Sequence, residues 1–467
     1  MRKKRFSKYL LITALTLLPA VAAGGGGELE ERLKGLLPEG AEWSMSVMDI
    51  NTNSVIYDVR SGSRAAESAS GLTPASLVKL FTSGASLEHA NKIDMTTYIS
   101  RDAKLKSNVL NGNLYLTGRG NALLSEADLR NAVKDMLKSG IKTVNGNIVA
   151  DDTLFDASGL ARTRKGPAYA PPSALGLDLH TVAVSVMPSK AGEPPVTRIV
   201  PFNNSVRFSV SARTIEGGIN TLSIIRISDT EYSVSGSVAQ GTKPAKERFA
   251  LEDPALYAAG VLKTLLEEAG VKISGSAVKG AAPKDAVVIT KINAPGIRTI
   301  VRDMSSQSVN VLADNLLLLI GVERYGAPGT KEKGTKALEE FAFSFTANNE
   351  APRFADGSGL SSDNKITTKA LAAYLSGAAK KPWFDAFAAG LETPGHGRAQ
   401  LADFADKDFI IKTGGLEDVF SVAGYGTDMK GRKVAFAFMA NGKGAGVFGG
   451  DRAGAEALRY VKTGVMQ

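Results

Sequence analysis

The sequence of 467 residues contains no cysteine and only three histidines, His89, His180 and His396. The absence of cysteine excludes disulfide bonds and any metal site built from thiolates. Three widely separated histidines leave little material for a zinc site or for a catalytic triad based on histidine. We therefore expect neither a metal nor another cofactor, and an enzyme of this composition needs a base other than histidine.

Residues 1–23 have the pattern of a secretory signal peptide. Five positive charges up to Lys8 precede an apolar run over residues 9–18, which is short for a membrane span and is followed by small residues. We expect cleavage after Ala22 or Ala23 and an extracytoplasmic, periplasmic location. An uncleaved amphipathic anchor with peripheral membrane contact is the alternative, while the lack of cysteine argues against a lipid-anchored lipoprotein.

The net charge of +9 overstates the basicity of the mature chain. Removing the five positive charges of the signal peptide leaves +4, so the composition does not indicate nucleic acid as a partner. The 444 residues that remain (467 less 23) are enough for roughly two to four domains. A hydrophobic content of 43% supports an ordinary globular core.

Both ends of the chain predict strands of one sheet. Residues 42–62 read as two strands around an Asn-Thr-Asn turn, an antiparallel hairpin. Three further strands are predicted within residues 408–415, 419–428 and 432–442, and the chain closes with a helix over residues 450–464. We therefore predict an α+β fold in which five strands from both ends form one sheet covered by helices.

The middle of the chain predicts a nested insertion. The first and last parts of the terminal domain are residues 28–95 and 297–467. An inserted α/β domain comprises residues 96–181 and 253–296, where strands and helices alternate. A small β-rich domain over residues 182–252, with period-two alternation, lies within that insertion. The sequence shows no internal repeat or low-complexity tract.

The first candidate catalytic motif is SxxK at Ser76 and Lys79. On a helix these side chains lie on one face, about 5–6 Å apart at Cβ. In the first helical turn the backbone N–H groups stabilise negative charge, so a Ser nucleophile with a neutral Lys base is feasible. The alternative is an N-cap serine with a solvated lysine. Against it, apolar residues surround Lys79, and a buried lysine is costly without a partner.

The SxxK spacing by itself has little specificity. It also occurs at Ser139, Ser276 and Ser362, each followed three residues later by a lysine. Most copies in this chain are therefore accidental, and the assignment of Ser76 depends on the other motifs.

The second motif is SxN at Ser308 and Asn310, directly before a leucine-rich helix that would hold both side chains rigidly. A proton relay and an amide clamp are suitable roles, and the alternative is an N-cap serine with an exposed asparagine. A literal SDN also occurs at residues 362–364. Its neighbourhood is rich in Asn and Gly, which predicts a loop.

The third motif is KTG at Lys412, Thr413 and Gly414, at the end of a β-prone run. Here an ammonium and a hydroxyl lie side by side, ready to bind a carboxylate. Gly414 has no side chain to block a ligand lying against the strand. The second KTG, at residues 462–464, follows a helix, with Gly464 as a predicted C-cap, and has no strand to present it.

The order SxxK, SxN, KTG is known from class A β-lactamases and penicillin-binding proteins. Over nearly the whole mature chain the sequence resembles the class C low-molecular-mass penicillin-binding proteins, which are D-alanyl-D-alanine carboxypeptidase/endopeptidases of the bacterial cell wall. The resemblance also rests on NLYLTGRG, GNIVADDTLFD, YAPPSALGLDLHTVAVSVMP, FADGSGLSSDN and KTGGLEDVFSVAGYG. Ser308 follows Ser76 by 232 residues (308 less 76), far more than in a compact β-lactamase, and the nested insertion accounts for the excess.

The resemblance implies a transpeptidase-like catalytic domain with two accessory domains and a Ser76 acyl-enzyme. Lys79, kept neutral by Lys412, burial and hydrogen bonding, would accept the Ser76 proton. Ser308 would relay a proton to the leaving D-alanine, and Asn310 would hold the peptide amide.

The remaining roles implied by the resemblance concern substrate binding. Lys412 and Thr413 would bind the terminal carboxylate, and the backbone N–H groups of Ser76 and Gly415 would form the oxyanion hole, where one donor is worth about a hundredfold or more in rate. The implied partners are peptidoglycan stem peptides ending in D-Ala-D-Ala, cross-linked muropeptides and β-lactam antibiotics such as penicillin.

Two alternatives and one question of specificity stay open. A β-lactamase is the nearer rival, and a non-catalytic peptidoglycan-binding scaffold is the more distant one, although all seven expected motif positions are present. Diaminopimelate recognition is a trait of the family, and Asp151, Asp152 or Asp156 are candidates for binding the side-chain ammonium of that residue. The alternative is that these aspartates only stabilise turns and helix caps. The chain departs from the family at residues 121–124 and at Ser362, which replaces a frequent arginine.

Overall fold

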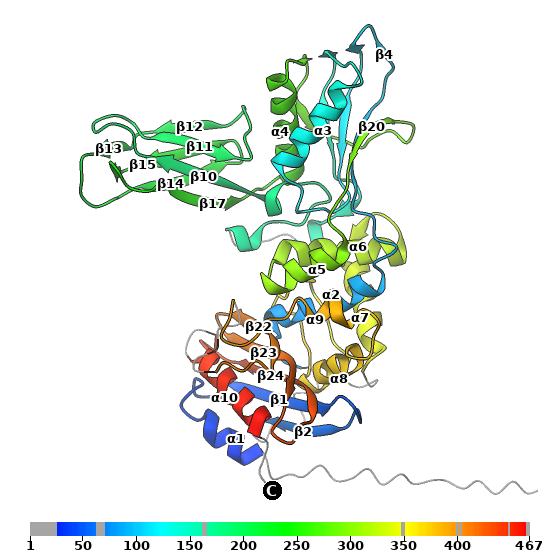
Figure 1. Cartoon of the computed structure of the whole chain (residues 1–467), viewed down its shortest axis with the longest axis vertical. Coiled ribbons are helices and arrows are strands. Elements are labelled where there is room, and N and C mark those ends of the chain that lie inside the picture. The colour runs from blue at the N-terminus through cyan, green and yellow to red at the C-terminus, as the bar shows by residue number, and fades with distance from the viewer. Residues whose placement is uncertain are drawn as a thin grey trace, which may run out of the picture.

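The molecule is elongated, with the two ends of the chain forming one end and the middle of the chain the other (Figure 1). The computed structural model describes residues 26–61, 71–160, 166–346, 351–397, 401, 404–446 and 449–463. The predicted signal peptide, residues 1–23, lies outside these ranges. Within them, no helix combines the length and the apolar character needed to cross a membrane.

One end of the molecule holds an antiparallel sheet of five strands in the order β2-β1-β24-β23-β22. Its first strands pair with its last, since β1 aligns with β24 from Glu42 opposite Asn441 to Asp49 opposite Val434. The predicted α+β fold, with a five-stranded sheet from both ends of the chain, is confirmed. The strands are β1 (Glu42–Asp49), β2 (Val55–Arg60), β22 (Ile410–Leu416), β23 (Val419–Thr427) and β24 (Lys433–Asn441).

Helices bury both faces of this sheet, and β24 shows why its sequence is almost continuously apolar. Phe436 and Phe438 belong to the core shared with α1 (Gly26–Leu33) and α10 (Gly450–Thr463). Ala437 and Met439 alternate with them and belong to the core on the other face. There α8 (Thr368–Ala378) contacts β1 and β24.

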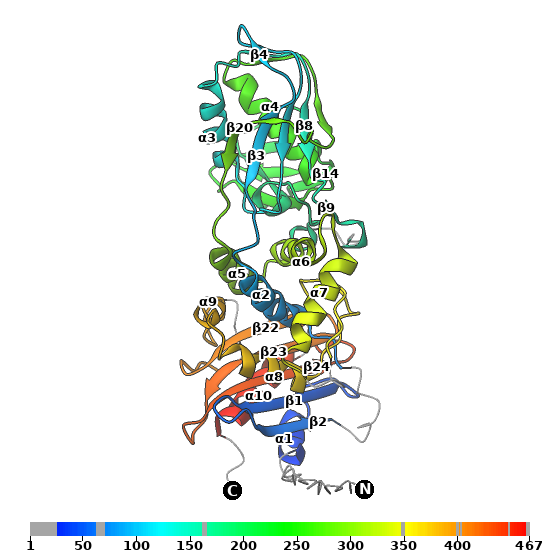
Figure 2. The ribbon, with the colours of Figure 1, turned by 90° about the vertical axis from the view of Figure 1, so that its right-hand side faces the viewer.

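A layer of helices lies between the terminal sheet and the inserted part of the chain (Figure 2). The leucine-rich α6 is almost fully buried, and its residues 316–320 belong to the core on this side of the sheet. The helices of this layer are α2 (Val78–Glu88), α5 (Ile297–Ser306), α6 (Asn310–Tyr325), α7 (Lys331–Phe343) and α9 (Phe384–Ala388).

The inserted α/β part contains two sheets and two helices. A capping box between Ser125 and Asp128 starts α3. The five-stranded sheet β19-β8-β6-β3-β20 consists of β3 (Thr97–Arg101), β6 (Leu114–Thr117), β8 (Ile148–Asp151), β19 (Ala277–Lys279) and β20 (Val287–Ile292). The four-stranded sheet consists of β4 (Leu105–Lys106), β5 (Val109–Leu110), β7 (Thr143–Val144) and β18 (Lys272–Ile273), and the helices are α3 (Glu126–Leu137) and α4 (Pro254–Glu268).

The nested β-rich part packs two three-stranded sheets around residues such as Val184 and Tyr232. One sheet contains β10 (Thr181–Met187), β11 (Val196–Val200) and β17 (Ala245–Ala250), the other β12 (Arg207–Val210), β14 (Ser223–Ser228) and β15 (Glu231–Ser235), and β13 (Arg213–Ile215) pairs with β16 (Ser237–Ala239). These sheets lie within the segments expected from the sequence, while the domain limits themselves stay a prediction.

The insertion is fastened to α6 through the buried side chain of Asn315. Its Oδ1 accepts from the Ser173 backbone N–H at 3.1 Å, and its Nδ2 donates to the carbonyls of Gly120 and Ser173 at 3.0 Å each. In addition, β9 (Phe155–Asp156) pairs in parallel with β21 (Gly329–Thr330). The helix that begins at Asn310 therefore also carries the attachment of the insertion.

Candidate active site

The three sequence motifs meet in one open cleft of about 980 Å³. The turn before α2, the turn between α5 and α6, and the edge strand β22 each supply part of its lining. The motif residues that line it are Ser76, Ser308, Asn310, Lys412, Thr413 and Gly415. A second wall comes from the insertion and includes Leu123, Tyr169, Asp178, Thr181 and Arg248.

Ser76 lies in a 3₁₀ turn, Ala75–Leu77, that leads directly into α2. Ala75 has a φ of 47°, a strained value for a non-glycine residue, so the surrounding contacts fix this turn. The N-cap of α2 is Leu77 and makes no side-chain cap bond. The alternative interpretation of Ser76 as an N-cap is therefore wrong, and its half-buried hydroxyl faces the cleft.

Lys79 is fully buried, which also excludes the alternative of a solvated lysine. Its Nζ lies 3.0 Å from Ser76 Oγ, 2.7 Å from Asn310 Oδ1 and 2.5 Å from the Ser358 carbonyl oxygen. The SxxK and SxN motifs are thus joined through one amine. The Asn310 amide is oriented as well, because its Nδ2 donates to the Ala168 carbonyl at 2.9 Å.

Ser308 occupies the sharp turn between α5 and α6, with a φ of 53°. The N-cap of α6 is Val309, so the N-cap alternative for Ser308 is wrong too. Lys412 is buried, and its ammonium donates to Ser308 Oγ at 3.1 Å and to the Thr413 carbonyl at 2.8 Å. Lys412 therefore connects the KTG strand to the SxN turn across the cleft.

Among the described residues, no strand pairs with β22 on the side opposite β23. Ile411 exchanges both backbone hydrogen bonds with Glu392, on the side of β22 opposite β23. Backbone groups alternate along an antiparallel strand, so those of Thr413 and Gly415 point to the same outer edge. A Cβ on Gly415 would meet only one atom within 4 Å, at 4.0 Å. The Gly415 N–H thus lies on an edge that has no strand partner among the described residues, whereas the Thr413 carbonyl on the same edge accepts from Lys412 Nζ.

Gly414 has a different role from the one expected. It does not line the cleft, and a Cβ there would lie 2.4 Å from Ser421 Oγ, 2.8 Å from Ser76 N and 2.9 Å from the Pro74 carbonyl. The missing side chain therefore makes room for the turn that carries Ser76, and not for a ligand. Ser421 fixes the same contact, because its hydroxyl donates to the Pro74 carbonyl at 2.7 Å.

The other copies of the motifs lie away from this cleft. Ser139, Ser276 and Ser362 are exposed and absent from its lining. Lys462 is in the last turn of α10 and pairs with Asp406 at 3.1 Å and Asp408 at 3.0 Å. Gly464, the predicted C-cap, lies outside the described residues.

The three aspartates considered for substrate specificity do not line this cleft, and their role in specificity stays a prediction. Asp151 accepts hydrogen bonds from the Thr153 backbone and hydroxyl and from the Ala282 backbone. Asp152 pairs with Lys279 at 2.8 Å, and Asp156 accepts two hydrogen bonds from Ser158 that lower the pKa of its carboxyl. All three hold local structure, as turn and cap aspartates do.

The described part of the chain places its histidines outside the cleft. None of the three histidines lines the cleft. His180 is buried close behind it, and burial lowers the pKa of its imidazole to about 4 while Nδ1 is 2.7 Å from the Pro171 carbonyl. No group of three potential metal ligands occurs among the described residues.

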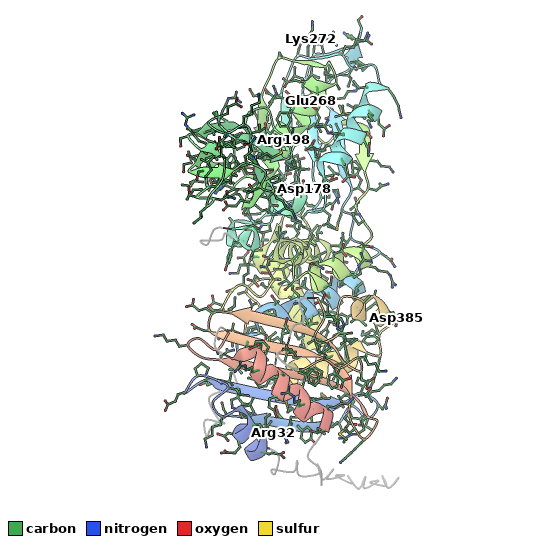
Figure 3. The ribbon with its side chains drawn as sticks, turned by 60° about the vertical axis from the view of Figure 1, so that its left-hand side comes forward. Arg32, Asp178, Arg198, Glu268, Lys272 and Asp385 are labelled. Carbon is green, nitrogen blue, oxygen red and sulfur yellow. The ribbon has the colours of Figure 1, made fainter. Side chains whose placement is uncertain are left out.

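Two features of the site were missed in the sequence. The Ser358 carbonyl, a main-chain atom of the segment FADGSGLSSDN, accepts from Lys79 Nζ, and no side chain of that segment indicates this contact. Asp178 and Arg248, from the insertion, supply charges to the cleft wall. Figure 3 shows Asp178 where the insertion meets the helix layer. In the sequence, the only indication of Asp178 is its place in the segment YAPPSALGLDLHTVAVSVMP, which supports the family resemblance.

Comparison with known proteins identifies the family. The sequence matches the D-Ala-D-Ala carboxypeptidase 3 (S13) family over residues 27–457. It is 26% identical to the D-alanyl-D-alanine carboxypeptidase DacB of Haemophilus influenzae, over 93% of this chain and 92% of that protein. It is 28% identical to the D-alanyl-D-alanine carboxypeptidase of Actinomadura sp. strain R39, over 93% of this chain and 85% of that protein.

The fold agrees with this match. The crystal structure of penicillin binding protein 4 (dacB) from Haemophilus influenzae aligns with a TM-score of 0.76 and 23% identity, over 93% of this chain and 99% of that one. The same protein in complex with a β-lactam aligns with a TM-score of 0.73. With its three motifs gathered in one cleft, the chain belongs to the D-Ala-D-Ala carboxypeptidase 3 (S13) family of serine peptidases.

Proposed function

We propose that this protein cleaves the bond between the two D-alanines of peptidoglycan stem peptides through an acyl-enzyme on Ser76. The observation that carries this proposal is the position of Lys79 Nζ, 3.0 Å from Ser76 Oγ and buried among acceptors from two other segments. A neutral amine has two N–H groups and one lone pair. Asn310 Oδ1 and the Ser358 carbonyl accept the two N–H groups, which leaves the lone pair for the Ser76 hydroxyl.

Acylation then proceeds by proton transfers between neighbouring groups. Ser76 Oγ bonds to the carbonyl carbon of the penultimate D-alanine while its proton passes to Lys79. The negative oxygen that results accepts from the backbone N–H groups of Ser76 and Gly415, the latter on the outer edge of β22. Ser308, which lies 3.1 Å from Lys412 Nζ, gives its proton to the departing amine as the C–N bond breaks and takes in exchange the proton that Lys79 accepted from Ser76, so that Lys79 is neutral again.

The substrate is held by the same three motifs. Lys412 and the Thr413 hydroxyl bind the terminal carboxylate, and Asn310 binds the peptide amide. The outer edge of β22 lets the substrate backbone lie along it as an added strand. Water then releases the acyl group and regenerates Ser76. Attack on a cross-link instead of a terminal D-alanine uses the same atoms, so the site supports endopeptidase activity as well.

The cellular setting follows from the substrate. Peptidoglycan lies outside the cytoplasmic membrane, and residues 1–23 have the pattern of a signal peptide, so we propose an exported enzyme. A related protein has been solved with a β-lactam. The same nucleophile here would open a β-lactam ring and remain acylated, which makes penicillin a probe of the site.

Mass spectrometry of reaction products tests the activity. With a stem pentapeptide we expect a loss of one D-alanine, and with a cross-linked muropeptide we expect two uncrosslinked products. Absence of both products would favour the peptidoglycan-binding scaffold. The lifetime of the penicillin adduct separates the β-lactamase alternative, since rapid release of hydrolysed penicillin favours a β-lactamase and a long-lived adduct the carboxypeptidase.

The cleft wall formed by the insertion is the proposed site of specificity for the third peptide residue. Asp178 lies in a turn of three consecutive non-glycine residues with positive φ, residues 178–180. The turn is held because the Asp178 and Leu179 N–H groups donate to the carbonyls of Leu124 and Ala122. Burial raises the pKa of the Asp178 carboxyl, and the nearby Arg248 guanidinium partly offsets this.

Both charges of this wall are available to a ligand. The Asp178 carboxylate makes no hydrogen bond or ion pair with another residue that the structure describes. Arg248 donates to Thr181 Oγ1 at 2.6 Å and has no carboxylate within ion-pair distance among the described residues. A side chain that ends in an ammonium and a carboxylate, as diaminopimelate does, would satisfy both.

Kinetics with matched peptides test this assignment. Asp178→Asn and Arg248→Gln are each expected to lower kcat/KM for a diaminopimelate peptide about tenfold, the value of one charge-assisted hydrogen bond. Acylation by penicillin, which lacks that side chain, should stay unchanged. Asp152→Asn and Asp156→Asn are the controls. A larger effect of the controls than of the Asp178 variant would reject the assignment.

A further inference from the structure

The loop of residues 355–364 lies directly behind the nucleophile and contains the SDN sequence that has no place in the cleft. Its asparagine, Asn364, is fully buried. Asn364 Oδ1 accepts from the backbone N–H of Ala355 at 2.8 Å and of Asp356 at 3.4 Å. Its Nδ2 donates to Asp356 Oδ1 at 3.1 Å and to the Ser361 carbonyl at 2.8 Å. One side chain thus ties the two ends of the loop together.

Asp356, which is also fully buried, continues this network into the tip of the loop. Its Oδ1 accepts from the Gly359 N–H at 2.6 Å, and its Oδ2 accepts from the Ser361 N–H at 2.8 Å. On the other side, Asp314 Oδ1 of α6 accepts from the Gly357 N–H at 3.1 Å. The backbone on either side of Ser358 is therefore fixed by hydrogen bonds.

The loop in turn touches the nucleophile segment at three points. The Ser358 carbonyl accepts from Lys79 Nζ, and the Gly357 carbonyl accepts from Thr82 Oγ1 at 2.8 Å, one turn further along α2. Gly359, with a φ of 85°, approaches the strained residue before Ser76, because a Cβ on it would lie 1.9 Å from the Ala75 carbonyl oxygen. The loop therefore supports both the serine and its proposed base.

We propose that Asn364 is a positioning residue for catalysis, which acts through Asp356 and the Ser358 carbonyl to hold the Lys79 amine against Ser76. The proposal rests on the function proposed above. A lysine side chain has four rotatable bonds, and its nitrogen is aligned with a hydroxyl only if other acceptors restrict it. Asn310 supplies one such acceptor from the cleft side, and the loop supplies the other from behind.

The alternative is that Asn364 only stabilises the loop. Four hydrogen bonds from one buried amide contribute to stability in any case. The two roles differ because the hydrogen-bond network ends at the Ser358 carbonyl, which accepts from the Lys79 amine. A positioning role therefore predicts a loss of reaction rate in molecules that remain folded, whereas a purely structural role predicts fewer folded molecules that react at the normal rate.

Penicillin acylation kinetics of the full chain separate the two roles. For Asn364→Leu, which has a similar volume and no polar group, we expect the rate constant of acylation at saturating penicillin to fall at least tenfold. The dissociation constant of the initial complex should change less than twofold. Thr82→Val, which removes the hydrogen bond from Thr82 Oγ1 to the Gly357 carbonyl of the loop, should lower the same rate constant by a smaller factor. This variant keeps the test available if Asn364→Leu does not fold.

Tyr374→Phe is the matched control, because its hydroxyl donates to the Leu80 carbonyl of the same helix at 2.9 Å, away from the loop. It should lose stability but label at the wild-type rate. If the Asn364 and Thr82 variants label at the wild-type rate with only a reduced labelled fraction, the positioning role is excluded. If the wild-type protein itself is not labelled, the proposed Ser76 acyl-enzyme is rejected, a result distinct from a failure of the Asn364 variants alone.

Discussion

Replacement of Ser76 by alanine is expected to abolish covalent labelling by penicillin and to lower kcat/KM for D-Ala-D-Ala release by at least about 10⁴-fold. The oxygen that forms the proposed acyl-enzyme, 3.0 Å from Lys79 Nζ, is lost. Lys79, Ser308 and Lys412 would remain in place but with nothing to activate. Intact-protein mass spectrometry after incubation with penicillin gives the result directly, as a mass shift in the wild type and none in the variant.

Three further serines of the chain provide the control. Ser139, Ser276 and Ser362 share the SxxK spacing but are exposed and lie outside the cleft. Their alanine variants should label at the wild-type rate. Ser76→Ala removes one contact of Lys79 Nζ but leaves Asn310 Oδ1 and the Ser358 carbonyl as its acceptors, so this variant should also unfold at nearly the wild-type temperature. A mass shift retained in Ser76→Ala would place the nucleophile elsewhere and invalidate the site.

Gly414→Ala is the second change for which we expect a large effect. The added methyl group meets Ser421 Oγ, Ser76 N and the Pro74 carbonyl at distances too short for contact, and two of these are backbone atoms that cannot rotate away. We expect a destabilisation of about 1–3 kcal/mol from overpacking. Displacement of the Ser76 turn by a few tenths of an ångström or more should slow acylation about a hundredfold.

A glycine in open space separates the clash from the general effect of an added methyl group. Gly217 has no atom within 4 Å of its Cβ position and lies in the β-rich part of the insertion, so Gly217→Ala should leave stability and acylation unchanged. Thermal unfolding and the penicillin acylation rate measure both consequences. Wild-type acylation in Gly414→Ala would mean that the strand and the nucleophile turn are not packed as described.

The sequence was most informative where chemistry requires particular side chains in a particular order. Ser76, Lys79, Ser308, Asn310 and Lys412 were predicted from their motifs, and the structure brings all five together. The five-stranded sheet was predictable for a related reason, since strands buried on both faces, such as β24, have almost continuously apolar sequences.

Other parts of the site were not predictable, and each has a physical reason. The Ser358 carbonyl contributes a main-chain atom, which any residue would supply, so its position depends only on how the loop folds. Gly414 was assigned to a ligand because the sequence does not reveal that the Ser76 turn fills the space above it. Asp178 and Arg248 are 70 residues apart (248 less 178) and meet only through the packing of the insertion.

The pairing of β1 with β24 has a consequence for how the enzyme comes into being. The terminal sheet pairs residues 42–49 with residues 434–441, which are far apart in the sequence. The inserted sheets, by contrast, consist only of residues between 97 and 292. Contacts between distant segments form slowly, and domains fold as units during synthesis. We therefore expect the inserted sheets to form before the terminal sheet, so that the cleft is complete only once β1 has paired with β24 and β22 has joined the same sheet.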